Sequence, residues 1–145
     1  MEASKYKILF VCIHNSARSQ MAEAFLNQLG AGRFMAESAG IEPGKLNPNV
    51  VAVMAEIGID ISHNRTKGVF EFLDKGANYQ AVITVCDAAS AEKCPVFPGA
   101  VQRIAWSFAD PSGLIGSTES ILEQTREVRD AIRQKVVQFI EDRKL

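Results

Sequence analysis

The sequence predicts an α/β protein built on a single-domain, open, parallel sheet of four strands with helices on both faces. Apolar, β-rich runs alternate with helix-like runs, and helical connections between successive strands keep those strands parallel. The chain has 145 residues, 47% of them hydrophobic and 23% charged, which fits one soluble globular domain over residues 1–145. Parallel sheets bind ligands beyond the carboxyl ends of their strands, so we expect the functional residues there.

Each element has a local signal. Strands are expected at the short apolar runs, which are residues 7–11, 34–40, 79–85 and 101–106. Helices are expected at 18–29, from about 47 to 58, weakly at 70–74, and at 118–143. Asn47 followed by Pro48 is typical of a helix start, and Gly58 of a helix end.

Composition excludes several classes of function. A net charge of -1 gives no reason to expect nucleic-acid binding, and no apolar run is long enough to span a membrane. The amino terminus shows no signal-peptide pattern, so we expect a cytoplasmic protein. We also expect it to be a monomer. Three cysteines cannot form a fully paired disulfide framework, and two histidines without a Cys-x-x-Cys motif argue against a zinc site.

The most informative segment runs from Cys12 to Ser19, between the first strand and the first helix. A strand-to-helix turn offers free backbone N–H groups and the positive end of a helix dipole, which together bind anions. Arg18 adds a planar fork of donors suited to a tetrahedral oxyanion, and Cys12 would be held there as a thiolate nucleophile. The alternative is a buried strand-end cysteine with a surface arginine. The expected oxyanion-binding residues are Ile13, His14, Asn15, Ser16, Ala17, Arg18 and Ser19.

Three further residues are candidates for chemistry. Asp110, before Pro111, follows the fourth strand and could protonate a departing oxygen, or it could only cap a turn. Cys86 ends the third strand, and a short polar segment separates it from Cys94. These two thiols could exchange disulfides after a rearrangement, or Cys86 could be a core residue and Cys94 incidental.

The cysteine and arginine of this loop, followed by Ser-Gln-Met-Ala-Glu, resemble the low-molecular-weight protein tyrosine phosphatase superfamily. Asp110-Pro also matches that superfamily, and the match is closer to its thioredoxin-coupled arsenate reductases because Cys86 and Cys94-Pro correspond as well. The resemblance implies the low-molecular-weight phosphatase fold, with Asp110 as general acid. It also implies that Cys12 attacks arsenate, Cys86 attacks the adduct and releases arsenite, and Cys94 resolves the first disulfide. Thioredoxin would then reduce the final disulfide.

The sequence also departs from the family pattern. His14 stands where many relatives have glycine, Ala17 replaces a cysteine of some relatives, and the segment from Cys86 to Cys94 is one residue longer. No aromatic pair follows Asp110-Pro, which favours a small inorganic oxyanion such as arsenate or phosphate over an aryl substrate.

Some reductases of the family bind potassium near the loop. Asn15, Glu23 and Ser38 match its ligands, but Lys67 aligns with the fourth, an aspartate. The Lys67 ammonium could replace the cation, or Lys67 could be a solvated loop charge. We expect no tightly bound cofactor, and Lys67 makes potassium the less favoured choice.

Three functions remain in competition. The first is an arsenate reductase with a relay through Cys12, Cys86 and Cys94, retaining residual phosphatase activity. The second is a protein or small-molecule phosphatase that uses Cys12, Arg18 and Asp110. The third is a module that only binds oxyanions or senses oxidants through Cys12.

Overall fold

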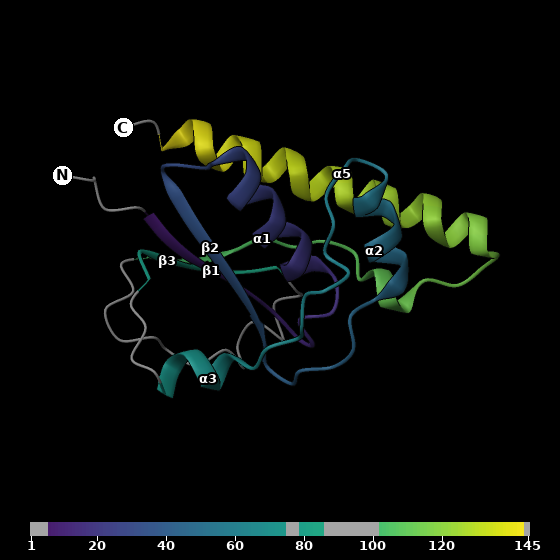
Figure 1. Ribbon diagram of the computed structural model, residues 1–145, viewed down its shortest axis with the longest axis horizontal. Coiled ribbons are helices and arrows are strands. Elements are labelled where there is room, and N and C mark those ends of the chain that lie inside the picture. Colours follow the sequence, from purple (N-terminus) through teal and green to yellow (C-terminus); the bar gives the residue numbers. More distant parts are fainter. Residues whose placement is uncertain (1–5, 75–78, 86–101, 144–145) are drawn as a thin grey trace.

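The predicted architecture, an open parallel sheet with helices on both faces, is confirmed (Figure 1). The computed structural model describes residues 6–74, 79–85 and 102–143. Its elements are β1 (Tyr6–Cys12), α1 (Arg18–Leu29), β2 (Phe34–Gly40), α2 (Pro48–Ala55), α3 (Val69–Asp74), β3 (Ala81–Thr84), β4 (Gln102–Ala105), the 3-10 turn η1 (Pro111–Gly113) and α5 (Thr118–Asp142). Within these residues no helix is both long enough and apolar enough to cross a membrane.

The sheet has the strand order β2-β1-β3-β4, and all of its pairs are parallel. After β1 the chain turns to one side to form β2, then crosses back to form β3 on the other side of β1. The connections diverge at this point, and such a switch point leaves a crevice at the carboxyl ends of the two central strands. Cys12, the last residue of β1, lies at that edge.

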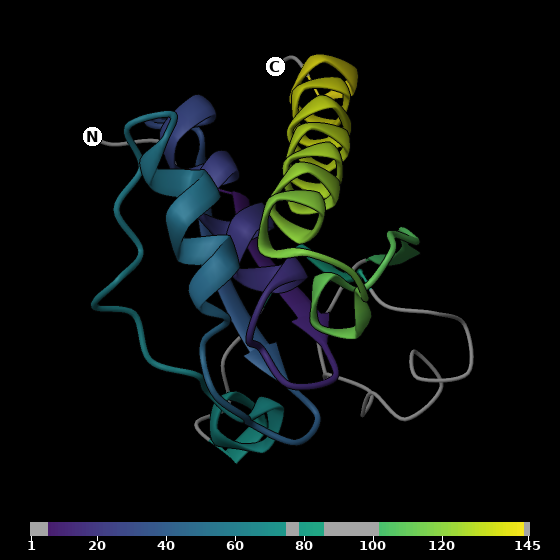
Figure 2. The same cartoon turned by 90° about the vertical axis from the view of Figure 1, so that its right-hand side faces the viewer.

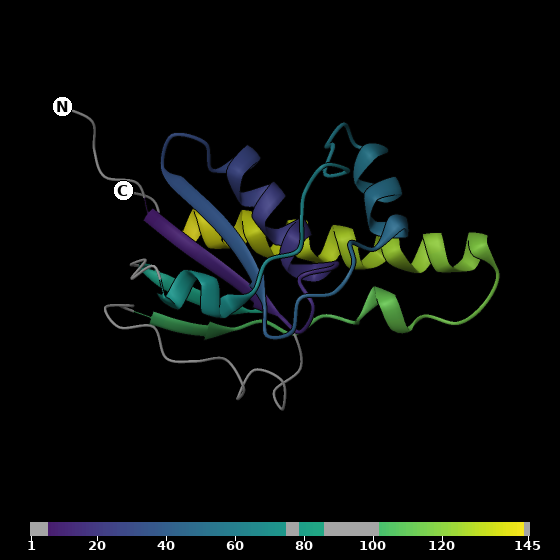
Figure 3. The same ribbon diagram turned by 60° about the horizontal axis from the view of Figure 1, so that its bottom comes forward.

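Alternation along β1 divides the core into two layers. Ile8, Phe10 and Cys12 belong to the cluster that includes α1 and α5, while Leu9 and Val11 belong to the cluster under α3. Figures 2 and 3 show α1, α2 and α5 on one side of the sheet and α3 on the other. A strand that is buried on both faces reads as a continuous apolar run, as β1 does.

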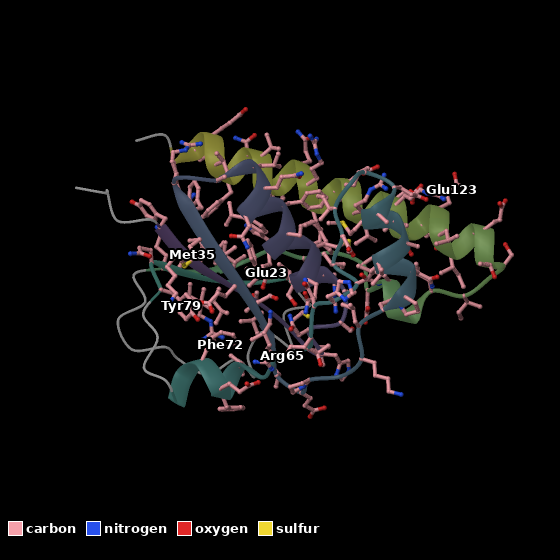
Figure 4. All side chains as sticks on the ribbon, in the orientation of Figure 1. Glu23, Met35, Arg65, Phe72, Tyr79 and Glu123 are labelled. Carbon is pink, nitrogen blue, oxygen red and sulfur yellow. The ribbon has the colours of Figure 1, made fainter. Side chains whose placement is uncertain are left out.

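Two aromatic side chains pack in the smaller core layer, the one under α3. Phe72 of α3 and Tyr79, both labelled in Figure 4, pack in this layer. The Tyr79 hydroxyl donates to Glu37 Oε1 at 3.2 Å. Burial, together with the adjacent Glu37 carboxylate, raises the pKa of Tyr79 well above its ordinary value, so the phenol stays protonated.

Aromatic packing fixes the connection that leads out of β4. The Trp106 ring lies 5.7 Å from the Phe10 ring and 5.7 Å from the Phe139 ring, and it meets the Phe108 ring edge-on at 6.4 Å. Phe10 is in β1 and Phe139 is in α5, so Trp106 joins the central strand to the long helix. The residues that follow Trp106, up to Asp110, therefore start from a rigid point.

Charged residues fasten α2 to α5. Arg126 binds both carboxylate oxygens of Glu56, and the nearly buried Arg129 donates to Glu56 and to the carbonyl of Val53. The hydrogen bonds from Arg126 hold the pKa of Glu56 below its ordinary value of 4.5.

The bounds of β3 and α2 differ most from the sequence prediction, and β3 covers only Ala81–Thr84 of the expected 79–85. Helix α2 ends at Ala55, and residues 56–58 form a turn instead of continuing the helix to Gly58. The N–H of Ile59 bonds to the carbonyl of Met54, and Gly58 has a φ of +80°. This is a glycine-terminated helix end, in which the glycine lies beyond the last helical residue.

Candidate active site

The Cys12 sulfur lies at the centre of the loop that follows β1. It is 3% exposed, and the backbone N–H of Asn15 donates to Sγ at 3.1 Å. Ser19 Oγ lies 2.9 Å from Sγ and accepts a hydrogen bond from Asn15 Nδ2 at 2.8 Å. Because Ser19 Oγ already accepts from the amide, its own proton is available for the sulfur. Cys12 Sγ thus lies against one backbone N–H and one hydroxyl, both within hydrogen-bond distance.

The carbonyls of the loop point away from its centre. Those of Cys12, Ile13 and His14 accept from the N–H groups of residues 41, 42 and 44 at 2.7–3.0 Å. The carbonyl of Ser16 accepts from the N–H of Asn47 at 2.9 Å. In a trans peptide the next N–H points opposite to the carbonyl, so these bonds turn the loop N–H groups inward. Of these N–H groups, that of Asn15 donates to Cys12 Sγ, and the inward-facing set can bind the oxygens of an anion.

Gly40 allows this close approach. A Cβ at this position would lie 2.7 Å from the backbone nitrogen of Asn15 and 2.9 Å from the carbonyl oxygen of Ile13. Both of those atoms belong to the backbone of the loop and have no room to move. The end of β2 therefore requires glycine for a steric reason, which the sequence alone did not reveal.

Asn15 has the left-handed backbone conformation, with a φ of +56°. It is fully buried, and its side chain ties the loop to two other segments. Its Oδ1 accepts from the backbone N–H of Lys67 at 2.9 Å and from Gln20 Nε2 at 3.0 Å. Asparagine is one of the few residues that adopts this conformation readily, which explains its use at the turn of the loop.

Arg18 is buried, and its guanidinium faces the segment that follows β4. Its Nη1 donates to the carbonyl of Phe108 at 3.1 Å, and its Nη2 lies 3.6 Å from Asp110 Oδ2. Its Nε is buried and has no hydrogen-bond partner among the described residues. A buried donor without a partner is costly, and an oxyanion bound over Cys12 would satisfy it.

The start of α1 adds to the positive field. Ala17 occupies its N-cap and makes no side-chain cap, whereas Asn47 caps α2 and Ser117 caps α5 with their side chains. The first turn of α1 also contains no acidic residue. Its terminal N–H groups and dipole therefore remain available for an anion.

Asp110 lies just before η1 at the rim of the site. Its side chain is 45% exposed and forms the ion pair with Arg18. A carboxyl in this position, beside the arginine that would hold the anion, is placed to exchange a proton with a departing oxygen. The sequence predicted this residue, but not the carbonyl of Phe108, which supports Arg18 from the same segment.

The potential cation ligands only partly converge. Glu23 Oε1 accepts from Ser38 Oγ at 2.7 Å and from Lys67 Nζ at 3.2 Å, and Figure 4 marks Glu23. The Lys67 side chain is 17% exposed, so it is a partly buried ion-pair partner and not a solvated loop charge. Asn15 is linked to these side chains through the backbone N–H of Lys67, which donates to Asn15 Oδ1. No cluster of three metal-ligating His, Cys, Asp or Glu side chains occurs among the described residues.

The remaining loop residues have separate positions. Ile13 is half-buried against the main core, and Ala17 is buried. His14 is exposed, with Nδ1 2.8 Å from the carbonyl oxygen of Glu42, so its ring points out of the loop. Cys86 and Cys94, the two further cysteines of the predicted relay, lie outside the described residues.

Comparison with known proteins agrees with this architecture. The family model for low molecular weight phosphotyrosine protein phosphatase matches residues 7–144. An arsenate reductase of Bacillus subtilis is 42% identical over 134 residues, covering 92% of this chain and 94% of the relative. An arsenate reductase of Shouchella clausii is 40% identical over 138 residues, covering 95% and 97%.

A solved structure described as an arsenate reductase in the phosphate binding state superposes with a TM-score of 0.79 and 32% identity. The superposition covers 96% of this chain and 99% of the chain in that structure. The sheet order, the Cys12 loop and the similarity over nearly the whole length all agree on one family. The chain belongs to the low molecular weight phosphotyrosine protein phosphatase family.

Proposed function

We propose that the protein reduces arsenate to arsenite, with Cys12 as the nucleophile. The proposal is carried by the buried Nε of Arg18, which has no hydrogen-bond partner among the described residues, in the same loop as a Cys12 sulfur that accepts from Asn15 and lies against Ser19. This is a receptor for a tetrahedral oxyanion with a nucleophile at its base. The relatives named arsenate reductases and the phosphate-binding state of a similar structure support this choice of anion.

In the first step the Cys12 thiolate attacks arsenic(V) and forms a sulfur–arsenic bond. One arsenic–oxygen bond breaks, and the departing oxygen leaves as water after it receives a proton. Arg18 and the inward N–H groups of the loop hold the remaining oxygens. Asp110, ion-paired with Arg18 at the rim, is the proposed proton donor.

Electrons pass to arsenic in the second step. The Cys86 thiolate attacks Cys12 Sγ, and the electron pair of the sulfur–arsenic bond stays with arsenic, which leaves as arsenite. Cys94 then attacks Cys86 Sγ, which frees the Cys12 thiolate and leaves a Cys86–Cys94 disulfide. A dithiol of the thioredoxin class reduces that disulfide, and the protein acts as a monomer. Val85, which precedes Cys86, donates its N–H to the carbonyl of Val11, next to Cys12.

A phosphatase is the second candidate, because Cys12, Arg18 and Asp110 suffice for phosphoester hydrolysis. Water would release phosphate from a Cys12 adduct, and neither Cys86 nor Cys94 would be needed. The two functions therefore separate at the two further thiols.

We also propose that the Lys67 ammonium replaces a bound potassium ion. Lys67 Nζ, Ser38 Oγ and Glu23 form a closed, partly buried group, in which the lysine supplies the positive charge opposite the carboxylate. A second cation would add like charge beside the ammonium.

Arg18→Lys should weaken oxyanion binding although the charge is retained. A lysine cannot donate from a planar fork, so about 2 kcal/mol or more of transition-state stabilisation should be lost. Steady-state kinetics with arsenate measures this as a fall in kcat/KM. An unchanged kcat/KM would remove Arg18 from the anion site.

Asp110→Asn should slow the first chemical step about 100-fold or more and remove one limb of the pH–rate profile. The amide keeps the shape of the side chain but delivers no proton. Pre-steady-state formation of the Cys12 adduct as a function of pH provides the measurement. A profile identical to that of the wild type would leave Asp110 as a turn residue.

Cys86→Ser should trap the Cys12–arsenic adduct and block arsenite release. Cys94→Ser should instead allow about one turnover and stop at a Cys12–Cys86 disulfide, because no third thiol resolves it. Mass mapping of disulfides after one equivalent of arsenate identifies each product. Aryl-phosphate hydrolysis by the same variants is the control, and it should survive both changes.

The relay fails if the wild type forms no Cys86–Cys94 disulfide and both variants turn over arsenate repeatedly with thioredoxin. Phosphate release that needs no reductant, without any arsenite, would favour the phosphatase.

Lys67→Asp should create a dependence on potassium that the wild type does not have. Replacing the ammonium by a carboxylate leaves two carboxylates facing each other, which a hard cation stabilises. The melting temperature in potassium chloride, compared with choline chloride at equal concentration, reports this effect. Lys45→Asp, at an exposed position, is the charge-matched control. A specific rise with potassium in the wild type would refute the replacement.

A further inference from the structure

Gln20 is a fully buried polar side chain behind the Cys12 loop, and the mechanism above does not use it. The two protons on its Nε2 are shared among three acceptors, which are the carbonyl of Asn15 at 3.1 Å, Asn15 Oδ1 at 3.0 Å and the carbonyl of Arg65 at 3.1 Å. Its Oε1 accepts from Asn64 Nδ2 at 3.0 Å. One amide thus bonds to the backbone and the side chain of the same loop residue and to a segment 45 positions away.

The position of Gln20 in α1 does not require a polar residue for packing. Its neighbours Met21 and Ala22 are buried in the apolar core, and an unbranched apolar side chain of equal length would fill the same volume. Burial of an amide is favourable only when its hydrogen bonds are made, and here its bonds converge on the loop and on residues 64–65.

Asn15 in turn contacts Cys12, so its position affects the hydrogen bonds of the sulfur. Its backbone N–H donates to Cys12 Sγ, and its Nδ2 holds the hydroxyl of Ser19, which lies 2.9 Å from the same sulfur. Asparagine tolerates the left-handed conformation that Asn15 has, and the hydrogen bonds from Gln20 and from the backbone N–H of Lys67 hold it in that conformation. Gln20 bonds to both the backbone carbonyl and the side-chain oxygen of Asn15.

We propose that Gln20 is a positioning residue, which fixes Asn15 so that its donors meet the Cys12 thiolate and the loop stays shaped for an oxyanion. The proposal rests on the proposed role of the loop as an oxyanion site. Asn64 supports Gln20 in turn, because it binds the oxygen of the amide and so sets which end of the amide faces Asn15. Residues 64–67 therefore act as a second support of the loop, beside residues 41–47.

The test uses Gln20→Met, which preserves length and volume but removes every hydrogen bond of the side chain. Two readouts follow the loop, namely the Kd for inorganic phosphate and the rate of alkylation of Cys12 by iodoacetamide. Alkylation is measured in a Cys86→Ser/Cys94→Ser background, where Cys12 is the one remaining thiol of three. We expect phosphate binding to weaken about tenfold and alkylation to slow, because a buried hydrogen-bond network is lost.

A double-mutant cycle with Asn15→Ala separates positioning from general stability. If Gln20 acts through Asn15, then Gln20→Met adds little further loss of phosphate affinity in the Asn15→Ala background. Asn64→Ala should reduce phosphate affinity in the same direction by a smaller factor, and it changes a less buried side chain. Gln28→Met, at an exposed position of the same helix, is the control and should leave both readouts unchanged.

Unchanged phosphate affinity and alkylation rate in a folded Gln20→Met protein would overturn the positioning role. Additive losses in the cycle would do the same, since they would show a general destabilisation. A wild type that binds no phosphate would contradict the proposed function instead, and the alkylation rates would still decide the role of Gln20.

Discussion

The site depends on the outward direction of the carbonyls in the loop after Cys12. Residues 41–47 donate to four of these carbonyls, and Gly40 lets the end of β2 come close enough for the chain to do so. With the carbonyls satisfied outside, the N–H groups face inward and form a fixed set of donors that does not depend on a charged side chain. Such preorganised dipoles stabilise an anionic transition state because they need no rearrangement during the reaction.

The fold supplies the other two parts of the site from distant positions in the chain. The switch of direction between β2 and β3 leaves the end of β1 open, and the aromatic contacts of Trp106 fix the segment that carries Phe108 and Asp110. Arg18 then links the loop to that segment through the Phe108 carbonyl and the Asp110 carboxylate. In the proposed reaction, binding of an anion and delivery of a proton are therefore coupled through one guanidinium.

The sequence predicted the sheet, its parallel direction and most helix bounds, because periodicity and helix signals are local properties. It also predicted the position of the Cys12 loop, since the strand, the cysteine, the arginine and the helix are contiguous. The supports of the loop were not predictable in the same way. Gly40 read only as a strand end, and Gln20 and Asn64 read as ordinary helix and loop residues, because their roles depend on contacts between distant segments. The partly buried state of Lys67 became apparent only with Glu23 beside it.

The most direct test of the account is a single turnover with arsenate and no added reductant, in which arsenite and free thiols are both counted. The account predicts about one arsenite per chain and a fall from three free thiols to one, because arsenic takes its two electrons from two cysteines. A folded Cys12→Ser protein should form no arsenite. Arsenite formation by that variant, or a wild type that retains all three thiols after exposure to arsenate, would contradict the account.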